Sequence, residues 1–334
     1  MVLSFGELLV RLSPDTAMDW FNKEQVNIYV GGSEMNIIAA LANWRMPVCF
    51  CTVVPDNFLA RNIVKKIATQ DIDTSAIVYY GDKIGLYYLH NEGTLKEDAI
   101  IYDRLHSSFY DLKPGVINWD DVFNGVRWFH FSSLSAGLND NTAAVCKEAL
   151  EACARKSITV SAYMHYDPEL WLNKNKPAEV MPELLQYCDV LISDLQSIGT
   201  LAGIQVPVPG DMRKDDHIQL AKKVSTEITK QFAKCKIIAN NFCSYDASAE
   251  IYGTIFINNN LYVSASYGSS EIVDKAGSGD SFAAGLIYGI YNHLPFQQVI
   301  NFAAASGFQK LLTKGERIHK TAEEIKSFIL HYKH

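Results

Sequence analysis

The sequence predicts a doubly wound α/β fold, in which a mostly parallel β-sheet is flanked by helices and carries a small second β-sheet as a lid. Two observations lead to this prediction. Short apolar runs alternate along the chain with longer amphipathic or small-residue stretches, which is the pattern of successive strand–helix units. Two segments, residues 7–30 and 75–103, break this alternation with strand-like patterns that have no helix between them.

Six short runs have the composition of buried strands in the main sheet. They are rich in Val, Ile, Leu and Phe, and each is separated from the next by a stretch of helical or turn character. The predicted strands are Val2–Phe5, Val48–Val54, Trp128–Phe131, Ile158–Ala162, Val190–Ser193 and Lys236–Ile238. In a sheet of this kind ligands bind at the carboxyl ends of the strands, so we expect the functional residues there.

Eight stretches have helical character. Five lie between the predicted strands, and three follow one another at the C-terminus, where Thr321 and Glu324 form the pattern of a capping box. The predicted helices are Glu34–Trp44, Leu59–Thr69, Asn141–Arg155, Ala178–Cys188, His217–Phe232, Asp280–His293, Phe296–Leu312 and Thr321–Tyr332.

The lid is expected to consist of antiparallel strands outside the main sheet. Alternating patterns such as Ile77–Tyr80 and Leu86–His90 support this interpretation. We therefore treat residues 1–334 as one α/β domain, with lid strands inserted from about residues 7–30 and 75–103.

Composition narrows the range of functions. The chain has 334 residues, a net charge of −7 and 48% hydrophobic residues, which is ordinary for a globular protein and argues against a nucleic-acid partner. It has no apolar run of membrane-spanning length and no basic-then-apolar leader, so we expect no membrane association and a cytoplasmic location. The seven cysteines include no Cys-x-x-Cys pair, and we expect reduced thiols and no metal site built from them.

The run from Asp274 to Asp280 carries the strongest chemical signal. Gly277 and Gly279 permit a tight backbone, and a small-residue helix follows at once. The N–H groups at a helix start bind anions, and Asp280 stands where a carboxylate can accept a proton from a hydroxyl group. Taken alone, the run could be an ordinary strand-to-helix turn. We favour phosphoryl transfer to an alcohol, with Asp280 as the base and the anion held by the backbone N–H groups of Ala276, Gly277, Ser278 and Gly279.

This run resembles the signature of the ribokinase-like (PfkB) carbohydrate kinases, roughly Asp-Thr-x-Gly-Ala-Gly-Asp. A second family signature resembles Gly31-Gly32-Ser-Glu-Met-Asn36. The two signatures stand in the family order, one near each end of the chain. The resemblance implies the ribokinase-like fold, Asp280 as catalytic base, and ATP with Mg²⁺ as phosphoryl donor; dependence on a monovalent cation stays open.

Within that family the chain is most similar to 2-keto-3-deoxygluconate kinases. The similarity rests on Tyr29–Glu34, Gly85–Tyr87 and Tyr102–Arg104. It implies a sugar or sugar acid as substrate, and a planar guanidinium at Arg104 suits a carboxylate. The two tyrosines could instead be ordinary lid aromatics. The expected substrate contacts are Gly31, Gly32, Asn36, Tyr87, Tyr102 and Arg104.

The chain also departs from the family pattern. Tyr163, His165 and Asp167 stand where the family has Asp, Asn and Arg, and the nucleotide segment near residues 239–244 lacks its glycines. Ser193-Asp194-Leu-Gln196 replaces Asn-x-x-Glu. Two alternatives therefore stay open: a kinase-like protein that binds sugar or nucleotide without efficient catalysis, and a kinase for a neutral ketose or nucleoside. Lid sheets of related kinases often pair between subunits, so the resemblance is compatible with a homodimer formed through the lid.

Overall fold

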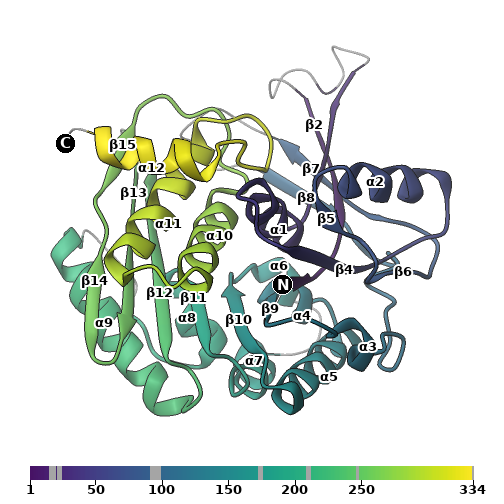
Figure 1. Cartoon of the computed structure of the whole chain (residues 1–334), viewed down its shortest axis with the longest axis horizontal. Coiled ribbons are helices and arrows are strands. Elements are labelled where there is room, and N and C mark those ends of the chain that lie inside the picture. Colours follow the sequence, from purple (N-terminus) through teal and green to yellow (C-terminus); the bar gives the residue numbers. More distant parts are fainter. Residues whose placement is uncertain are drawn as a thin grey trace.

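The computed structural model describes residues 1–14, 20, 25–90, 99–171, 176–207, 212–245 and 248–332. Parts of the predicted lid segments, at 15–19, 21–24 and 91–98, lie outside these residues. Figure 1 shows a large central sheet with helices on both sides and a smaller sheet, containing β2, β7 and β8, over one edge of it. The predicted fold class is confirmed.

The main sheet has eleven strands in the order β14-β13-β12-β11-β10-β9-β1-β4-β5, with β15 paired to β13 and β6 paired to β4. Pairing is parallel from β12 to β5 and antiparallel around β13. All six predicted strands belong to it. Its strands are β1 Val2–Phe5, β4 Val48–Val54, β5 Ile72–Asp73, β6 Ile77–Tyr79, β9 Trp128–Ser132, β10 Thr159–Met164, β11 Val190–Ser193, β12 Ile237–Tyr245, β13 Ala249–Ile257, β14 Asn260–Val263 and β15 Tyr267–Ser269.

Helices cover both faces of this sheet because successive strand residues point to opposite sides. Val2 belongs to the apolar core on one face, whereas Leu3 belongs to the core on the other. The first face is covered by α1 Ser33–Asn43, α2 Phe58–Ala68, α10 Ser278–Tyr291, α11 Phe296–Leu311 and α12 Ala322–His331. The second is covered by α3 Trp119–Val122, α4 Ser133–Ala136, α5 Asp140–Lys156, α6 Pro168–Trp171, α7 Pro177–Leu185, α8 Leu195–Ala202 and α9 Lys214–Gln231.

The small sheet differs from the prediction in two respects. Its order is β3-β2-β7-β8, and its central pair β2–β7 is parallel rather than antiparallel, because β2 and β7 come from two separate excursions of the chain. The run at Ile77 is not part of it: β6 pairs with the end of β4 in the main sheet, where Ile77 is buried in the core. The strands of the small sheet are β2 Leu9–Ser13, β3 Asn27–Gly31, β7 Gly85–His90 and β8 Ala99–Asp103.

The two faces of the small sheet have different surroundings. Tyr87 lies opposite Tyr102 on the face turned toward the main sheet. On the other face, Tyr88 lies opposite Ile101, and Ile28 continues the same cross-strand row. Ile28 is 69% exposed and Ile101 is 67% exposed, so this outer face presents apolar side chains to solvent.

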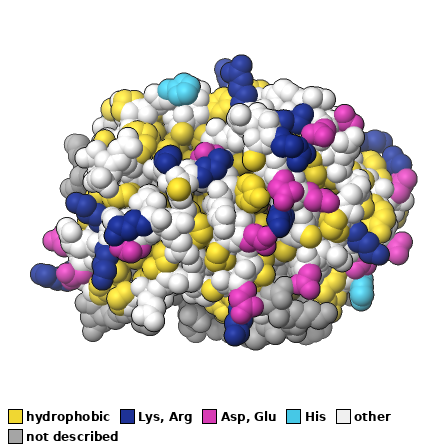
Figure 2. Space-filling model, turned by 90° about the horizontal axis from the view of Figure 1, so that it is seen from below, with side chains coloured by type: hydrophobic (Ala, Val, Ile, Leu, Met, Phe, Trp, Pro, Cys, Tyr) yellow, Lys and Arg dark blue, Asp and Glu magenta, His cyan; other side chains and the backbone are white. Residues whose placement is uncertain are grey.

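Charged side chains of both signs are interspersed on the face of the molecule that Figure 2 shows. Within the described ranges, no helix combines the length and the apolar character needed to cross a bilayer.

Candidate active site

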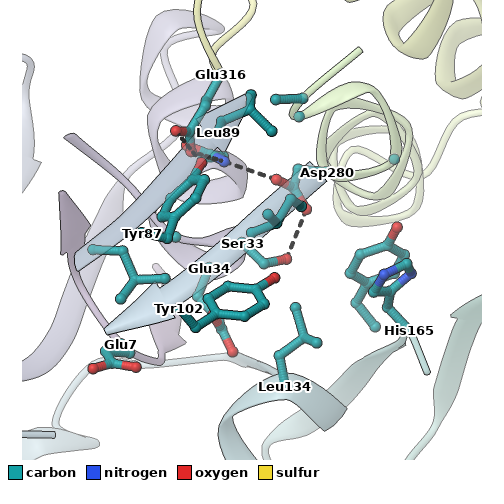
Figure 3. A pocket seen from close by; sticks show the side chains of 18 of the residues that line it. Glu7, Ser33, Glu34, Tyr87, Leu89, Tyr102, Leu134, His165, Asp280 and Glu316 are labelled. Carbon is teal, nitrogen blue, oxygen red and sulfur yellow. Dashed lines mark hydrogen bonds between the residues drawn. The ribbon is translucent and has the colours of Figure 1, made fainter. Parts of the chain in front are cut away.

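A cavity of about 310 Å³ lies between the small sheet and the carboxyl ends of the central strands. β1 stands between β4 and β9, where the winding of the sheet changes direction, and α/β sheets bind ligands at such a point. Figure 3 shows Tyr87 and Tyr102 on one side of the cavity and His165 on the other. Gly32 lines the cavity, together with the polar and aromatic residues Glu7, Ser33, Glu34, Asn36, Tyr87, Tyr102, Arg104, Tyr163, His165, Lys275, Asp280 and Glu316.

The start of helix α10 opens into this cavity. Gly277 is its N-cap residue, with φ 81° and ψ 4°, a left-handed conformation that a Cβ makes costly. A Cβ at Gly277 would lie 1.8 Å from the main-chain oxygen of Glu316. Glycine is therefore needed at this position both for its backbone conformation and for the close approach of residues 315–317.

The backbone N–H groups around this turn do not all face the cavity. The Ala276 N–H donates to Asp274 Oδ1 at 3.0 Å, and the Ser278 N–H donates to the Lys275 carbonyl at 3.2 Å. The Ser278 hydroxyl donates to the Gly307 carbonyl, away from the cavity. The N–H groups of Ala276 and Ser278 therefore already have partners within the turn, and the anion-binding role predicted for Ala276, Gly277, Ser278 and Gly279 stays a prediction.

Asp280 lies at the head of this helix with its carboxylate fixed by two donors. The Ser33 hydroxyl donates to Oδ1 at 2.7 Å and the Asn36 side-chain amide donates to Oδ2 at 2.8 Å. Burial raises the pKa of Asp280 to about 7, against the two hydrogen bonds, which lower it. The charges of Glu316 and Glu34 raise it further. A carboxylate with this pKa is suited to accept a proton near neutral pH.

Glu316 is a site residue that the sequence reasoning missed. Its carboxylate accepts a hydrogen bond from the Tyr87 hydroxyl and another from Asn36 Nδ2 at 3.3 Å. It reaches the cavity from the segment after α11, which has no motif to mark it. A Cβ on Gly31 would lie 1.8 Å from Glu316 Oε2, so Gly31 admits this carboxylate and is not itself part of the cavity lining.

The other predicted sugar contacts converge on the cavity. Gly32, Asn36, Tyr87, Tyr102 and Arg104 all line it. Gly32 has φ 107°, and a Cβ there would lie 2.2 Å from the Glu7 carbonyl, so only glycine lets the chain turn from β3 into α1 at this point.

Arg104 is buried and already has a partner. Its Nε donates to Glu7 Oε2 at 2.6 Å, and the Ser107 hydroxyl donates to Glu7 Oε1 at 2.5 Å. Both charged groups are nearly inaccessible, with side-chain exposures of 7% and 3%. The pair positions the guanidinium against the ring of Tyr102 at the edge of the cavity.

The Glu34 side chain connects the start of α1 to the end of β9 and to α4. Its Oε1 accepts hydrogen bonds from the Ser132 N–H and hydroxyl and from the Ser135 hydroxyl, at 2.6–3.0 Å. These donors come from the end of β9 and from α4, so the contacts hold the start of α1 over the strand ends. Burial raises the pKa of Glu34.

Tyr163, His165 and Asp167, which we predicted to depart from the family pattern, also have defined places. Tyr163 and His165 line the cavity with their rings stacked, and the Tyr163 hydroxyl lies 2.2 Å from where a Cβ on Gly279 would be. Asp167 lies near Tyr102. Burial is the main cause that raises the pKa of the Tyr102 phenol, and the charge of Asp167 raises it further. Residues 239–244 lie within β12, which continues to Tyr245 paired with β13, whereas we predicted a strand that ended at Ile238.

Comparison with known proteins agrees with this arrangement. A model of the pfkB family of carbohydrate kinases matches residues 1–322. The crystal structure of 2-dehydro-3-deoxygluconokinase from Thermotoga maritima is 30% identical, with a TM-score of 0.90 over 98% of this chain and 99% of that one. A 5-dehydro-2-deoxygluconokinase from Geobacillus thermodenitrificans is 26% identical over 91% of this chain and 85% of its own length. A fructokinase from Xylella fastidiosa with bound ATP is 18% identical, with a TM-score of 0.76 over 98% of both chains.

Proposed function

The chain belongs to the pfkB family of carbohydrate kinases, and from this premise we propose that it transfers the terminal phosphoryl group of ATP to a primary hydroxyl of a keto-deoxy sugar acid such as 2-keto-3-deoxygluconate. The observation that carries the proposal is the position of Asp280, a partly buried carboxylate with a pKa of about 7 at the N-terminal end of α10. The sugar-acid part of the proposal draws on the relatives from Thermotoga and Geobacillus.

In the proposed reaction the substrate hydroxyl lies beside Asp280. Its oxygen attacks the terminal phosphorus, its proton passes to the Asp280 carboxylate, and the bond from that phosphorus to the bridging oxygen breaks to release ADP. Ser33 and Asn36 hold the carboxylate in place through the step. The N–H groups of Gly277 and Gly279 stabilise the charge on the transferred group.

The rest of the cavity lining, beginning with Glu316 next to Asp280, binds the remainder of the sugar. Glu316, a hydrogen-bond acceptor, faces the cavity beside Tyr87, which suits sugar hydroxyl groups. A carboxylate of the substrate needs a positively charged or hydrogen-bonding partner. The side chains in the lining that can provide one are those of Arg104, His165 and Lys275. A sugar acid would therefore bind with its hydroxyl end toward Asp280 and its acid end toward Arg104.

The phosphoryl donor is proposed to be ATP with Mg²⁺. The fructokinase of the same fold holds ATP, and the N-terminus of α10 provides the dipole and the glycine-lined turn that phosphate groups require. Mg²⁺ bound to the nucleotide would neutralise phosphate charge during transfer.

A neutral ketose or nucleoside is the second candidate for the substrate. Asp167 stands beside Tyr102 where the family has an arginine, and Glu7 already neutralises the Arg104 guanidinium. Both features weaken the attraction of this end of the cavity for a carboxylate.

A coupled assay of ADP release should separate the two candidates. We expect kcat/KM to be highest for 2-keto-3-deoxygluconate or 5-dehydro-2-deoxygluconate among sugar acids, ketoses and nucleosides. Arg104→Lys should raise the KM for the sugar acid by about 10- to 100-fold, because one charge-assisted hydrogen bond contributes about 1.5–3 kcal/mol. The KM for any neutral sugar should change little.

Arg61→Lys is the matched control for this experiment. Arg61 Nε contacts Asp56 Oδ1 at 2.6 Å, the same distance as in the Arg104–Glu7 pair, but on the surface and far from the cavity. A higher kcat/KM for a ketose or nucleoside, unaffected by Arg104→Lys, would establish the second candidate instead.

We also propose that two copies pair through the outer face of the small sheet. The exposed row that includes Ile28 and Ile101 supports this pairing, since buried apolar surface stabilises an interface. Ile101→Lys should convert a dimer into a monomer in sedimentation velocity. Leu330→Lys, at an 81% exposed leucine in α12, should leave the dimer intact; a monomeric unmodified protein would contradict the proposal.

A further inference from the structure

One buried ammonium group lies next to the anion-binding turn without contacting the cavity. Lys310, in the last turn of α11, has no exposed surface. Its Nζ donates to the Asp274 carbonyl at 3.1 Å and to the Thr313 carbonyl at 3.0 Å. Burial lowers the pKa of this ammonium to about 8, whereas the Asp274 charge opposes that shift.

The two carbonyl groups belong to the two segments that build the site. Residues 274–279 form the turn at the head of α10, and residues 312–317 carry Glu316 into the cavity. Asp274 joins the same segments a second time, because its Oδ1 accepts from the Ala276 N–H and its Oδ2 from the Gly315 N–H, both at 3.0 Å. Arg11 forms an ion pair with Asp274 at 3.1 Å. The segments therefore meet around the Lys310 ammonium, which contacts their carbonyl groups, while the Arg11 guanidinium pairs with the Asp274 carboxylate.

Main-chain carbonyl oxygens that converge in a buried site are also the ligands that proteins use for K⁺. The Asp274 and Thr313 carbonyl oxygens both point at the Lys310 ammonium. Without a cation there, two buried acceptors would face each other with no donor, which is unfavourable. The ammonium supplies that cation from within the chain. The direct contact of Gly277 with Glu316 means that a shift of either segment moves the other.

We propose that the Lys310 ammonium acts as a built-in monovalent cation, which positions the anion-binding turn against residues 312–317 so that the protein needs no separate ion. Lys310 is then a positioning residue. The catalytic part of this inference rests on the proposed kinase function; the structural part does not.

The test replaces Lys310 with Met, which keeps most of the side-chain volume but removes the charge and leaves a space about one atom in size beside the two carbonyls. In buffers that contain only tetramethylammonium, Lys310→Met should lose about 10- to 100-fold in kcat, since small misplacements of reacting groups have effects of this size. KCl or NH4Cl should restore much of the activity and raise the Tm, whereas LiCl should not. The unmodified protein should respond equally to all four salts.

Lys234→Met is the matched control. Lys234 also donates to a main-chain carbonyl, that of Tyr187 at 2.7 Å, and to Asp189, but it lies away from the cavity lining. Its loss should lower Tm without any preference for K⁺ over Li⁺.

The Tm measurements need no substrate, so they test the inference even if no sugar proves to be phosphorylated. A Lys310→Met protein that folds only with K⁺ or NH4⁺ would support the proposal. Activity and Tm that are equal in all four salts would overturn it, as would K⁺ dependence in the unmodified protein.

Discussion

Asp280→Asn is expected to lower kcat by about 10²- to 10⁴-fold, the usual contribution of a general base, while the KM for the sugar changes little. An asparagine can occupy the same space. Its oxygen can accept from Asn36, and its amide can donate to Ser33, whose hydroxyl then accepts. The fold should therefore survive while the proton acceptor is lost.

The pH dependence of the unmodified protein provides a second measure. Because the pKa of Asp280 is about 7, kcat/KM should fall as the pH decreases below about 7 and the carboxylate becomes protonated. This acid limb should be absent from the residual activity of Asp280→Asn.

Stability should change in the opposite direction. An unfolded aspartate has a pKa of about 3.9, so the folded state holds a proton that the unfolded state has lost between about pH 4 and pH 7. By linkage, the contribution of this group to the free energy of unfolding is largest below about pH 4. It falls as the pH rises to about 7 and stays constant above that. The Tm of the unmodified protein relative to Asp280→Asn should follow this course.

Asp189→Asn is a suitable control because Asp189 also binds two donors, the Val160 N–H at 2.8 Å and Lys234 at 2.6 Å. Its side chain lies outside the cavity lining, so its replacement should affect stability without affecting kcat. If Asp280→Asn kept more than about a tenth of the activity, the assignment of the base would be wrong.

Gly277→Ala is expected to reduce kcat by at least about 100-fold, the size of effect seen when one anion-binding donor is removed, and to lower stability as well. The new methyl group would meet the Glu316 carbonyl at 1.8 Å and its carbon at 2.7 Å. Both are backbone atoms, so a rotamer change cannot relieve the clash. Displacement of residues 315–317 would also disturb the contacts of Glu316 with Tyr87 and Asn36.

Gly115→Ala is the control that measures the backbone strain of a left-handed alanine without any clash. Gly115 has the same φ of 81°, but a Cβ there would have nothing within 4 Å. It should lose only the roughly 1–2 kcal/mol of a left-handed alanine and keep full activity. Equal losses of Tm and kcat in the two variants would show that the close approach of Glu316 does not matter.

Much of the main sheet could be predicted because its signals are local. Buried parallel strands are short apolar runs, and the predicted and observed bounds of β1, β4 and β11 coincide. The hairpin β13–β14 was not predicted, although the residue type Asn marks its turn in the sequence. Asn258 and Asn259 both have positive φ, which hairpin turns require and which asparagine adopts more readily than most residues. The end of β12 was misplaced because Phe242 and Tyr245 pair with β13, a contact that becomes visible only with the second strand in place.

The site was predictable where motifs mark it and not elsewhere. Asp280, Asn36 and Tyr87 lie in recognisable segments and do meet at the cavity. Glu316 has no such mark, since its position depends on where α11 ends and on the space that Gly31 and Gly277 leave. The sequence does not show that the Ala276 N–H donates to Asp274, and the anion-binding role of that N–H stays a prediction.

The parallel pairing of β2 with β7 has a consequence for the order in which the molecule assembles. Ser13 and Leu89, which hydrogen-bond across this pair, are 76 residues apart in sequence, and β4, β5 and β6 lie between them. Closing so long a loop is slow unless the intervening chain is already placed. In refolding kinetics the small sheet should therefore be completed after the central strands, and a fragment that stops before β7 would lack the two strands that carry Tyr87 and Tyr102.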